Sequence, residues 1–170
     1  MRLLGRVRDL RLPDCWIGAG FVRSAVWDHL HHRASAPIDD VDVIWFDRER
    51  ATAATDREVE AQLRASDPSV TWSVKNQARM HLRNGDQPYT SAEDAVTRWP
   101  ETATAIALRL TDGGMEMMAP FGLEDLFSMT VRPTPTFASE KLAIIKKRVW
   151  EKRWLERWPR LRLTAGLKDL

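Results

Sequence analysis

The chain of 170 residues carries a net charge of +2, with 29% charged residues, 44% hydrophobic residues and one cysteine. This composition is typical of one globular domain, and the lone Cys15 excludes an internal disulfide framework or a thiolate metal cluster. No apolar run approaches the roughly 20 residues that span a bilayer, and the N-terminus lacks the apolar segment of a signal peptide. We therefore expect a cytoplasmic protein with one domain over 1–170 and no contact with membranes.

Short apolar runs and helical periodicities alternate along the chain. Strands are indicated by β-branched and aromatic residues, and helix starts by residues that cap, such as Asn76 and Ser91. In chain order we predict a strand (15–18), a helix (21–32), a strand (41–46), a helix (47–65), a strand (70–74), helices starting near Asn76 and Ser91, a hairpin (104–120), a short helix (121–129) and a long amphipathic helix (138–158).

The last two predicted strands flank the sequence TDGG, which is typical of a β-hairpin turn. Helices interleave with the other strands, so the predicted class is α+β or α/β with a mixed sheet. The core of the domain is expected over 12–130, and the C-terminal helix follows it. This C-terminal segment is strongly basic. A solvated basic face with its tryptophans turned to the core is the favoured interpretation, and contact with phosphates is the alternative.

The sequence GAG at 18–20 lies between the first predicted strand and the first predicted helix. A dinucleotide-binding turn requires G-x-G-x-x-G, with an acid about 20 residues later. Gly18, Gly20 and Asp40 fit these positions, but Arg23 stands where the third glycine would allow close packing of helix on strand. A glycine turn at a helix N-terminus also offers unpaired N–H groups to phosphates. This phosphoryl-transfer interpretation explains more of the sequence.

Two carboxylates, Asp40 and Asp42, lie in the next predicted strand. Residues two apart on a strand point to the same face, and two like charges side by side repel unless a cation lies between them. Oxygen ligands on one face suit Mg²⁺, and paired ions can clamp the attacking and leaving oxygens of a phosphoryl transfer. We predict that Asp40 and Asp42 bind metal and act in catalysis, whereas Asp39 points the other way.

The stretches GAGFVRSAVWDHLH and IDDVDVIWFD resemble the glycine turn and D-x-D strand of the DNA polymerase β-like nucleotidyltransferase superfamily. More closely, the chain resembles a bacterial family of nucleotidyltransferase proteins of uncharacterised substrate. The resemblance continues through WSVKNQARMH, PYTSAEDAVTRWPETATAIALRL and APFGLEDLFSMTVRPTP to KRWLERWPRL, and it covers nearly all of 12–161. It implies a nucleotidyltransferase-like mixed sheet with flanking helices, although the superfamily's leading helix is not expected at this N-terminus.

The resemblance implies that Gly18 and Gly20 approach the triphosphate of a nucleotide, while the Asp pair holds the metal ions. The superfamily's second glycine is closely followed by a serine, whereas Ala19 stands between the two glycines here. We therefore expect the hydroxyl contact to come from Ser24, and we expect Arg23 beside it to belong to the same nucleotide-binding set.

A third carboxylate comes from a neighbouring strand in the superfamily. The natural position on the predicted strand 70–74 is Ser73, which is not acidic. Glu116 is the best substitute as the third catalytic acid, with Asp47 behind it, and Glu101 is a further candidate. Without a third acid, the base that deprotonates the acceptor hydroxyl is missing.

A dense polar run adjoins the end of the predicted strand 70–74. In the functional interpretation, Lys75 and Arg79 neutralise phosphate charge, while Asn76 and Gln77 read a base or an acceptor. In the structural interpretation, Asn76 caps a helix and Arg79 is a surface cation. Lys75, Asn76 and Arg79 are our candidate substrate and phosphate contacts.

Together these patterns predict a Mg²⁺-dependent nucleotidyltransferase. It would move a nucleoside monophosphate from a nucleoside triphosphate (NTP) to an unidentified acceptor, which is a small molecule, an RNA or a protein. The alternative is a catalytically degenerate nucleotide- or nucleic-acid-binding module, motivated by the missing third acid and the basic C-terminal segment. A redox enzyme with a nicotinamide cofactor is a weaker third hypothesis.

Overall fold

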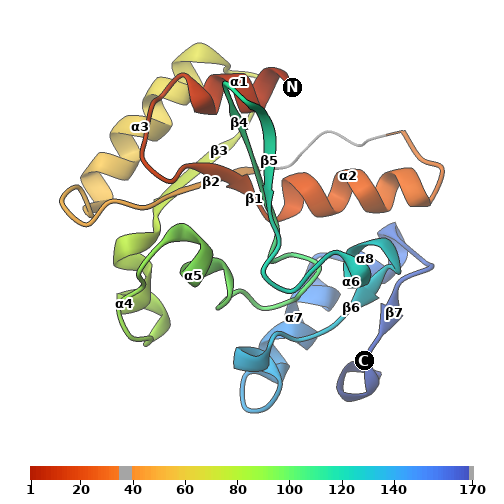
Figure 1. Cartoon of the computed structure of the whole chain (residues 1–170). Coiled ribbons are helices and arrows are strands. Elements are labelled where there is room, and N and C mark those ends of the chain that lie inside the picture. The colour runs from red at the N-terminus through yellow and green to blue at the C-terminus, as the bar shows by residue number, and fades with distance from the viewer. Residues whose placement is uncertain (35–39, 169–170) are drawn as a thin grey trace.

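The largest feature of the computed structural model, which describes residues 1–34 and 40–168, is a mixed β-sheet (Figure 1). Within these residues the sheet has five strands in the order β3-β2-β1-β4-β5. β2 and β3 run parallel, and the other neighbouring strands are antiparallel. The bounds are β1 (Trp16–Gly18), β2 (Val41–Trp45), β3 (Trp72–Asn76), β4 (Ala107–Thr111) and β5 (Gly114–Met118). The predicted mixed sheet and its hairpin are confirmed.

The register of the sheet places small residues beside the predicted metal ligand. Asp42 lies opposite Gly18 on one side and opposite Ser73 on the other, and Gly18 in turn lies opposite Ala107. Residues directly opposite each other share a face of the sheet. Asp42 therefore projects from a stretch of sheet whose neighbouring side chains are short, which leaves room above it.

One face of the sheet is closed by α1 (Arg2–Arg8) and α3 (Ala53–Ser66). Alternate residues of β2, namely Val41, Val43 and Trp45, are completely buried there. The expectation of no leading helix was wrong, because α1 buries Leu4 and Val7 against this face. Only these two residues of its seven are buried, which explains why its periodicity is too short to recognise.

The predicted helix 47–65 begins later than expected. Asp47 accepts hydrogen bonds from the backbone N–H groups of Glu49 and Arg50, which folds the chain into a turn. Thr52 then caps α3 by accepting a hydrogen bond from the Thr55 N–H. The helix therefore starts only after the cap.

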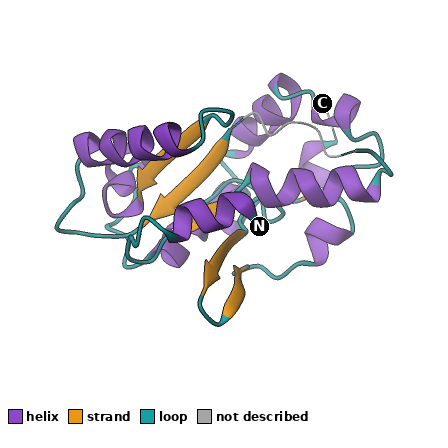
Figure 2. Ribbon diagram, turned by 90° about the horizontal axis from the view of Figure 1, so that it is seen from above, coloured by secondary structure: helices purple, strands orange, loops and turns teal. Residues whose placement is uncertain are grey.

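The opposite face of the sheet is covered only in part. α5 (Ala92–Val96), capped by Ser91 as predicted, packs over β1, β2 and β4 through Ala92 and Val96. η1 (Gln77–Arg79) and α4 (Met80–Asn84) follow β3 and lie to one side of α5 (Figure 1). Figure 2, the view from above, shows the strands flanked by helices. The uncovered part of this face includes Asp42.

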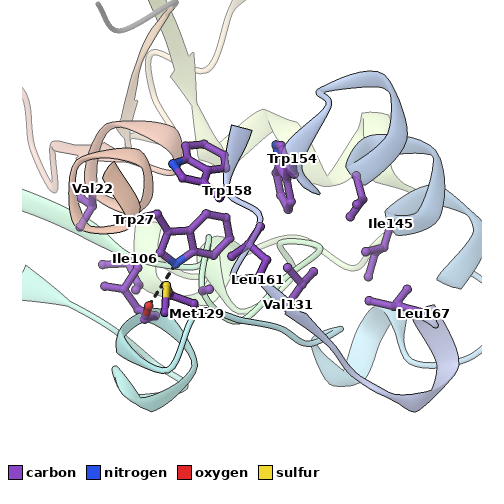
Figure 3. Close-up of a cluster of buried hydrophobic side chains, with 13 residues drawn as sticks. Val22, Trp27, Ile106, Met129, Val131, Ile145, Trp154, Trp158, Leu161 and Leu167 are labelled. Carbon is purple, nitrogen blue, oxygen red and sulfur yellow. Dashed lines mark hydrogen bonds between the residues drawn. The ribbon is translucent and has the colours of Figure 1, made fainter. Parts of the chain in front are cut away.

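The predicted long helix over 138–158 was wrong. The structure has α7 (Leu142–Glu151) and α8 (Trp154–Arg157), separated by Arg153, whose φ of 50° is left-handed. This break turns the chain so that Trp154 and Trp158 both pack edge-on against Trp27 of α2 (Gly20–Leu30) (Figure 3). The remaining elements of this region are α6 (Glu124–Phe127), β6 (Thr130–Val131), η2 (Pro135–Phe137), β7 (Arg162–Leu163) and η3 (Ala165–Leu167).

The C-terminal segment therefore forms a second core with α2. Its buried residues come from α2, α6, α7, α8, β6 and η3 and from the loops between elements. The Trp27 Nε1–H donates a hydrogen bond to the Leu126 carbonyl at 3.0 Å. Among the described residues, no helix is both long and apolar enough to cross a membrane.

Candidate functional site

Two cavities meet at Asp42. The first, here called the sheet-side cavity, has a volume of about 630 Å³ and extends from β2 and β3 toward α4 and α7. The second, here called the helix-side cavity, has a volume of about 730 Å³ and lies between α2 and the α7–α8 segment. Among the described residues, four line both cavities: Ala19, Asp42, Thr104 and Arg148.

Of the two predicted metal ligands, Asp42 lies at this junction and Asp40 lies just before β2. Asp42 is half-buried and lines both cavities, while Asp40 is exposed and lines the helix-side cavity. Neither has an ion-pair partner within 4.0 Å among the described residues. Asp39 lies outside the described part of the chain.

The pKa of the Asp42 carboxyl is raised, first by burial and then by the negative charge of Asp40. A hydrogen bond from Ser73 and the charges of Lys152 and Lys75 lower it in part. Two neighbouring carboxylates with this much uncompensated negative charge are a donor set that fits a hard divalent cation. The residues present therefore fit Mg²⁺.

The glycine turn approaches the site differently from the prediction. A Cβ added to Gly18 would lie 2.6 Å from the Trp99 ring, so Gly18 is required by packing, and it lines neither cavity. Ala19, with a φ of 53°, lines both cavities instead, and Gly20 starts α2 at the wall of the helix-side cavity. The backbone of 19–20, rather than Gly18, faces the space available to a ligand.

Arg23 is a buried cation on the wall of the helix-side cavity, with only 6% of its surface exposed. Its guanidinium carbon lies 4.4 Å from the ring centroid of Trp154 and within 6 Å of two further tryptophans. The Nη groups donate long hydrogen bonds to Thr104 (3.4 Å) and Ser24 (3.3 Å), while Nε has no hydrogen-bond partner in the part of the chain that the structure describes. Burial lowers the pKa of Arg23 to about 10, and the Glu101 carboxylate partly offsets this effect.

The predicted substrate contacts after β3 separate into two groups. Lys75 lines the sheet-side cavity, together with Gln77. Asn76 is completely buried, accepts a hydrogen bond from the Ala78 N–H and donates to the carbonyls of Asp47 and Arg50. The structural interpretation therefore describes Asn76 correctly.

Arg79 lies in neither cavity, because its guanidinium is ion-paired with the buried Asp56 of α3. It is not a free surface cation either, since the carboxylate that holds it is on the closed face of the sheet. The structure thus does not bring Asn76 or Arg79 to the space beside Asp42.

The structure does not bring Glu116 to this site. It lies on β5, three strands away from β2 in the sheet, and forms an ion pair with Arg109 at 2.5 Å. Its hydrogen bond with Arg109 lowers its pKa. Neither cavity is lined by Glu116, so the sequence suggestion of Glu116 as the third acid is not supported by its position.

The other candidate acids are also engaged elsewhere. Asp47 organises the turn before α3 and pairs with Arg50, and Glu101 is held by Arg148 at 2.8 Å. The position beside Asp42 on β3 is occupied by Ser73, as expected. No group of three or more His, Cys, Asp or Glu residues that could hold a metal occurs in the described part of the chain.

Several cavity residues had no recognisable signal in the sequence. The sheet-side cavity contains four cations, Lys75, Arg83, Arg98 and Lys141, that have no ion-pair partner within 4.0 Å in the described residues. Only Lys75 among them was predicted. The other three cations come from separate loops and helix ends. For Lys141 alone, the basic character of the C-terminal segment was an indication in the sequence.

Comparison with known proteins gave no match among curated sequences, but several among solved structures. The chain is 36% identical to a protein whose structure is described as revealing a CCA-adding enzyme head domain, with a TM-score of 0.85. That match covers 96% of this chain and 88% of the other.

Larger enzymes share the fold at lower identity. A Thermotoga maritima CCA-adding enzyme complexed with tRNA is 17% identical (TM-score 0.60), and the match covers 99% of this chain but 40% of the enzyme. A CCA-adding enzyme in complex with CTP is 16% identical (TM-score 0.62), with coverages of 99% and 41%. The chain thus spans less than half the length of these two enzymes.

A family model described as "Nucleotidyltransferase" matches residues 5–163. This match includes the sheet, both cavities and the C-terminal segment, and it agrees with the resemblance seen in the sequence. The chain belongs to this nucleotidyltransferase family.

Proposed function

We propose that this protein is a Mg²⁺-dependent nucleotidyltransferase that transfers a nucleoside monophosphate from an NTP to an acceptor, with release of pyrophosphate. The observation that carries the proposal is the position of Asp42 at the junction of two cavities, with Asp40 beside it. A group transfer requires two substrates that meet at one reacting centre. The two cavities provide space for both.

The helix-side cavity suits the phosphates of the nucleotide. The N-terminus of α2, which has 11 residues, opens on it at Gly20, and helix N-termini attract anions. Arg23 adds a buried cation with an unpartnered Nε, and Ser24 adds a hydroxyl at the same wall. These residues would bind and orient the triphosphate next to the Asp pair.

The transfer forms a bond between an acceptor oxygen and the α-phosphorus and breaks the bond from that phosphorus to the bridging oxygen of pyrophosphate. When the acceptor is a hydroxyl, its proton leaves to solvent. Asp40 and Asp42 would hold Mg²⁺, which supplies electrostatic stabilisation of the oxygens around phosphorus when bound. Apart from the four shared residues, different parts of the chain line the two cavities, and they provide separate space for the leaving group and the acceptor of an in-line displacement.

The sheet-side cavity suits an anionic acceptor. Among residues 1–34 and 40–168, five cations line it, compared with the two carboxylates of Asp42 and Asp86. The four cations without ion-pair partners favour an acceptor that carries phosphate. The solved relatives include enzymes in complex with CTP and with tRNA, and we therefore propose an RNA end as the first acceptor to examine, ahead of a small phosphorylated molecule or a protein.

The test is the substitution Asp42→Asn. We expect the variant to lose Mg²⁺-dependent binding of NTP analogues and transfer of labelled nucleotide, because it removes one carboxylate ligand. Asp9→Asn, at an exposed ion pair with Arg8 outside both cavities, is the matched control and retains both. Unchanged binding and transfer in Asp42→Asn would contradict the proposal.

A second candidate function rests on Ser73, which occupies the place of the third acid. The protein would then be a nucleotide- or nucleic-acid-binding module that has lost transfer. Salt-sensitive RNA binding that persists without metal, with no labelled product from any NTP, would favour this function over the first.

A further inference from the structure

Arg148 is the one long cationic side chain that lines both cavities in the described part of the chain. It comes from α7, whereas the Asp pair and the glycine turn come from the first third of the sequence. The Arg148 side chain is 29% exposed and is therefore half-buried. A cation in this position borders any ligand that reaches Asp42 from either side.

The buried Glu101 fixes the orientation of Arg148. Glu101 is 1% exposed, and its Oε1 and Oε2 accept hydrogen bonds from Arg148 Nε (2.8 Å) and Nη2 (3.4 Å). This bidentate pair uses one edge of the planar guanidinium. Nη1 has no hydrogen bond to a described residue. Because Arg148 lines both cavities, this nitrogen is the part of the guanidinium left to contact a ligand.

Glu101 itself lines neither cavity. Its negative charge acts on both Arg148 and the buried Arg23, which are close enough to influence each other. A carboxylate enclosed in this way is poorly placed to take a proton from an acceptor. In this position the Glu101 carboxylate instead keeps the Arg148 guanidinium in place, although the positive charge of Arg23 repels it.

We propose that Arg148 contacts the phosphate that is transferred and that Glu101 is its positioning residue. This inference rests on the proposed nucleotidyl transfer and deepens it. A guanidinium held in one orientation stabilises charge that develops on phosphate oxygens without reorganising during the reaction. Lysine cannot reproduce this arrangement, because an ammonium group lacks the second edge that engages Glu101.

The experiment measures the affinity of the full chain for non-hydrolysable analogues of the four NTPs with Mg²⁺. Arg148→Gln is expected to lower the affinity for the tightest-binding analogue by roughly 10- to 100-fold, as for loss of a hydrogen bond to a charged group. Arg148→Lys is expected to lower this affinity by a smaller factor. Glu101→Gln is also expected to lower the affinity for the analogue, although Glu101 does not contact the ligand. Arg132→Gln, which breaks the exposed ion pair with Asp125 outside both cavities, is the control and keeps wild-type affinity.

Two readouts separate positioning from mere structural support. In the double variant, Glu101→Gln adds nothing once Arg148 is glutamine, because its effect acts through Arg148. Added guanidinium, far below denaturing concentrations, restores analogue binding to Arg148→Ala but not to Asp42→Asn.

The outcomes also separate this inference from the proposed function. If Asp42→Asn loses binding while Arg148→Gln keeps it, the role of Arg148 is overturned and the proposed function stands. If the effects of Glu101→Gln and Arg148→Gln are fully additive, the positioning role of Glu101 is overturned. If the wild-type protein binds no analogue, both proposals fail.

Discussion

The two faces of the sheet have opposite characters, although the same strands build them. On the face closed by α1 and α3, Val43 and Trp45 are completely buried, and the buried Asp56 is ion-paired with Arg79. On the other face, Asp42 has no ion-pair partner within 4.0 Å among the described residues, and Nε of Arg23, on the wall of the helix-side cavity, has no hydrogen bond within this part of the chain. Adjacent residues of β2 thus differ in environment: Val43 and Trp45 are packed in the core, whereas Asp42 lines the cavities and has a raised pKa.

The largest expected effect is on the closed face, from Trp45→Ala. Trp45 is completely buried and donates a hydrogen bond from Nε1 to Asp56 at 3.0 Å. The substitution leaves a cavity and should lower the free energy of unfolding by about 3–5 kcal/mol, measured by urea denaturation. Trp150→Ala, at a tryptophan that is 76% exposed, is the control and should change stability little. A small loss in Trp45→Ala would show that the two faces do not differ in packing.

Gly18→Ala tests how closely side chains pack beside Asp42 on the face of the sheet that is covered only in part. The new Cβ would meet the Trp99 ring at 2.6 Å, so the ring or the strand must move, at a cost of roughly 1–3 kcal/mol. At Gly20 the nearest atom to such a Cβ is 3.5 Å away, and Gly20→Ala should cost far less. Equal stability of the two variants in thermal unfolding would contradict the close contact with Trp99.

Asp42→Asn is expected to stabilise the metal-free protein by a modest rise in Tm. The pKa of Asp42 is raised in the folded state, so its ionised form disfavours folding, and this penalty is present above the folded-state pKa. As the pH falls through that pKa toward the unfolded value, the carboxyl becomes protonated and the penalty disappears. The Tm difference between variant and wild type should therefore be largest at neutral pH and shrink in acid. A Tm difference that is absent at neutral pH would break the proposed contrast between the faces.

The smallest expected effect concerns the rate at which the Cys15 thiol is alkylated. Cys15 packs at the edge of the closed face, where burial, followed by the charge of Asp14, raises its pKa to about 12. Few thiolates exist at neutral pH, so alkylation by iodoacetamide should be slow in the native protein and rapid after denaturation. Asp42→Asn should leave the native rate unchanged, whereas Trp45→Ala should increase it. Fast native alkylation would show that this edge opens readily.

Local patterns predicted much of the fold and part of the site. The strand that carries Asp42 and the cap at Ser91 depend only on neighbouring residues, and the structure has both Asp42 on β2 and the Ser91 cap. The placement of Asp40 on the same strand was wrong, because β2 begins at Val41 and Asp40 lies just before it. The break at Arg153 could not be predicted, because it follows from packing of Trp154 and Trp158 on a helix more than a hundred residues earlier.

Long-range pairs explain the remaining differences. Arg79 is of a residue type that often binds phosphate, but it forms an ion pair with Asp56, which lies 23 residues away in the chain. Glu101 and Arg148 are 47 residues apart, and neither forms a motif with its neighbours. The sequence could therefore not predict the surroundings of a candidate residue whose partner lies far away in the chain.

The late position of Arg148 has a consequence for synthesis of the protein. The glycine turn and the Asp pair leave the ribosome about a hundred residues before Arg148. A domain generally folds as a unit, and residues of α7 and α8 share a core with Trp27 of α2. The Glu101–Arg148 pair therefore cannot form until these last helices have been synthesised, so the space around Asp42 lacks its shared arginine until nearly the whole chain is available.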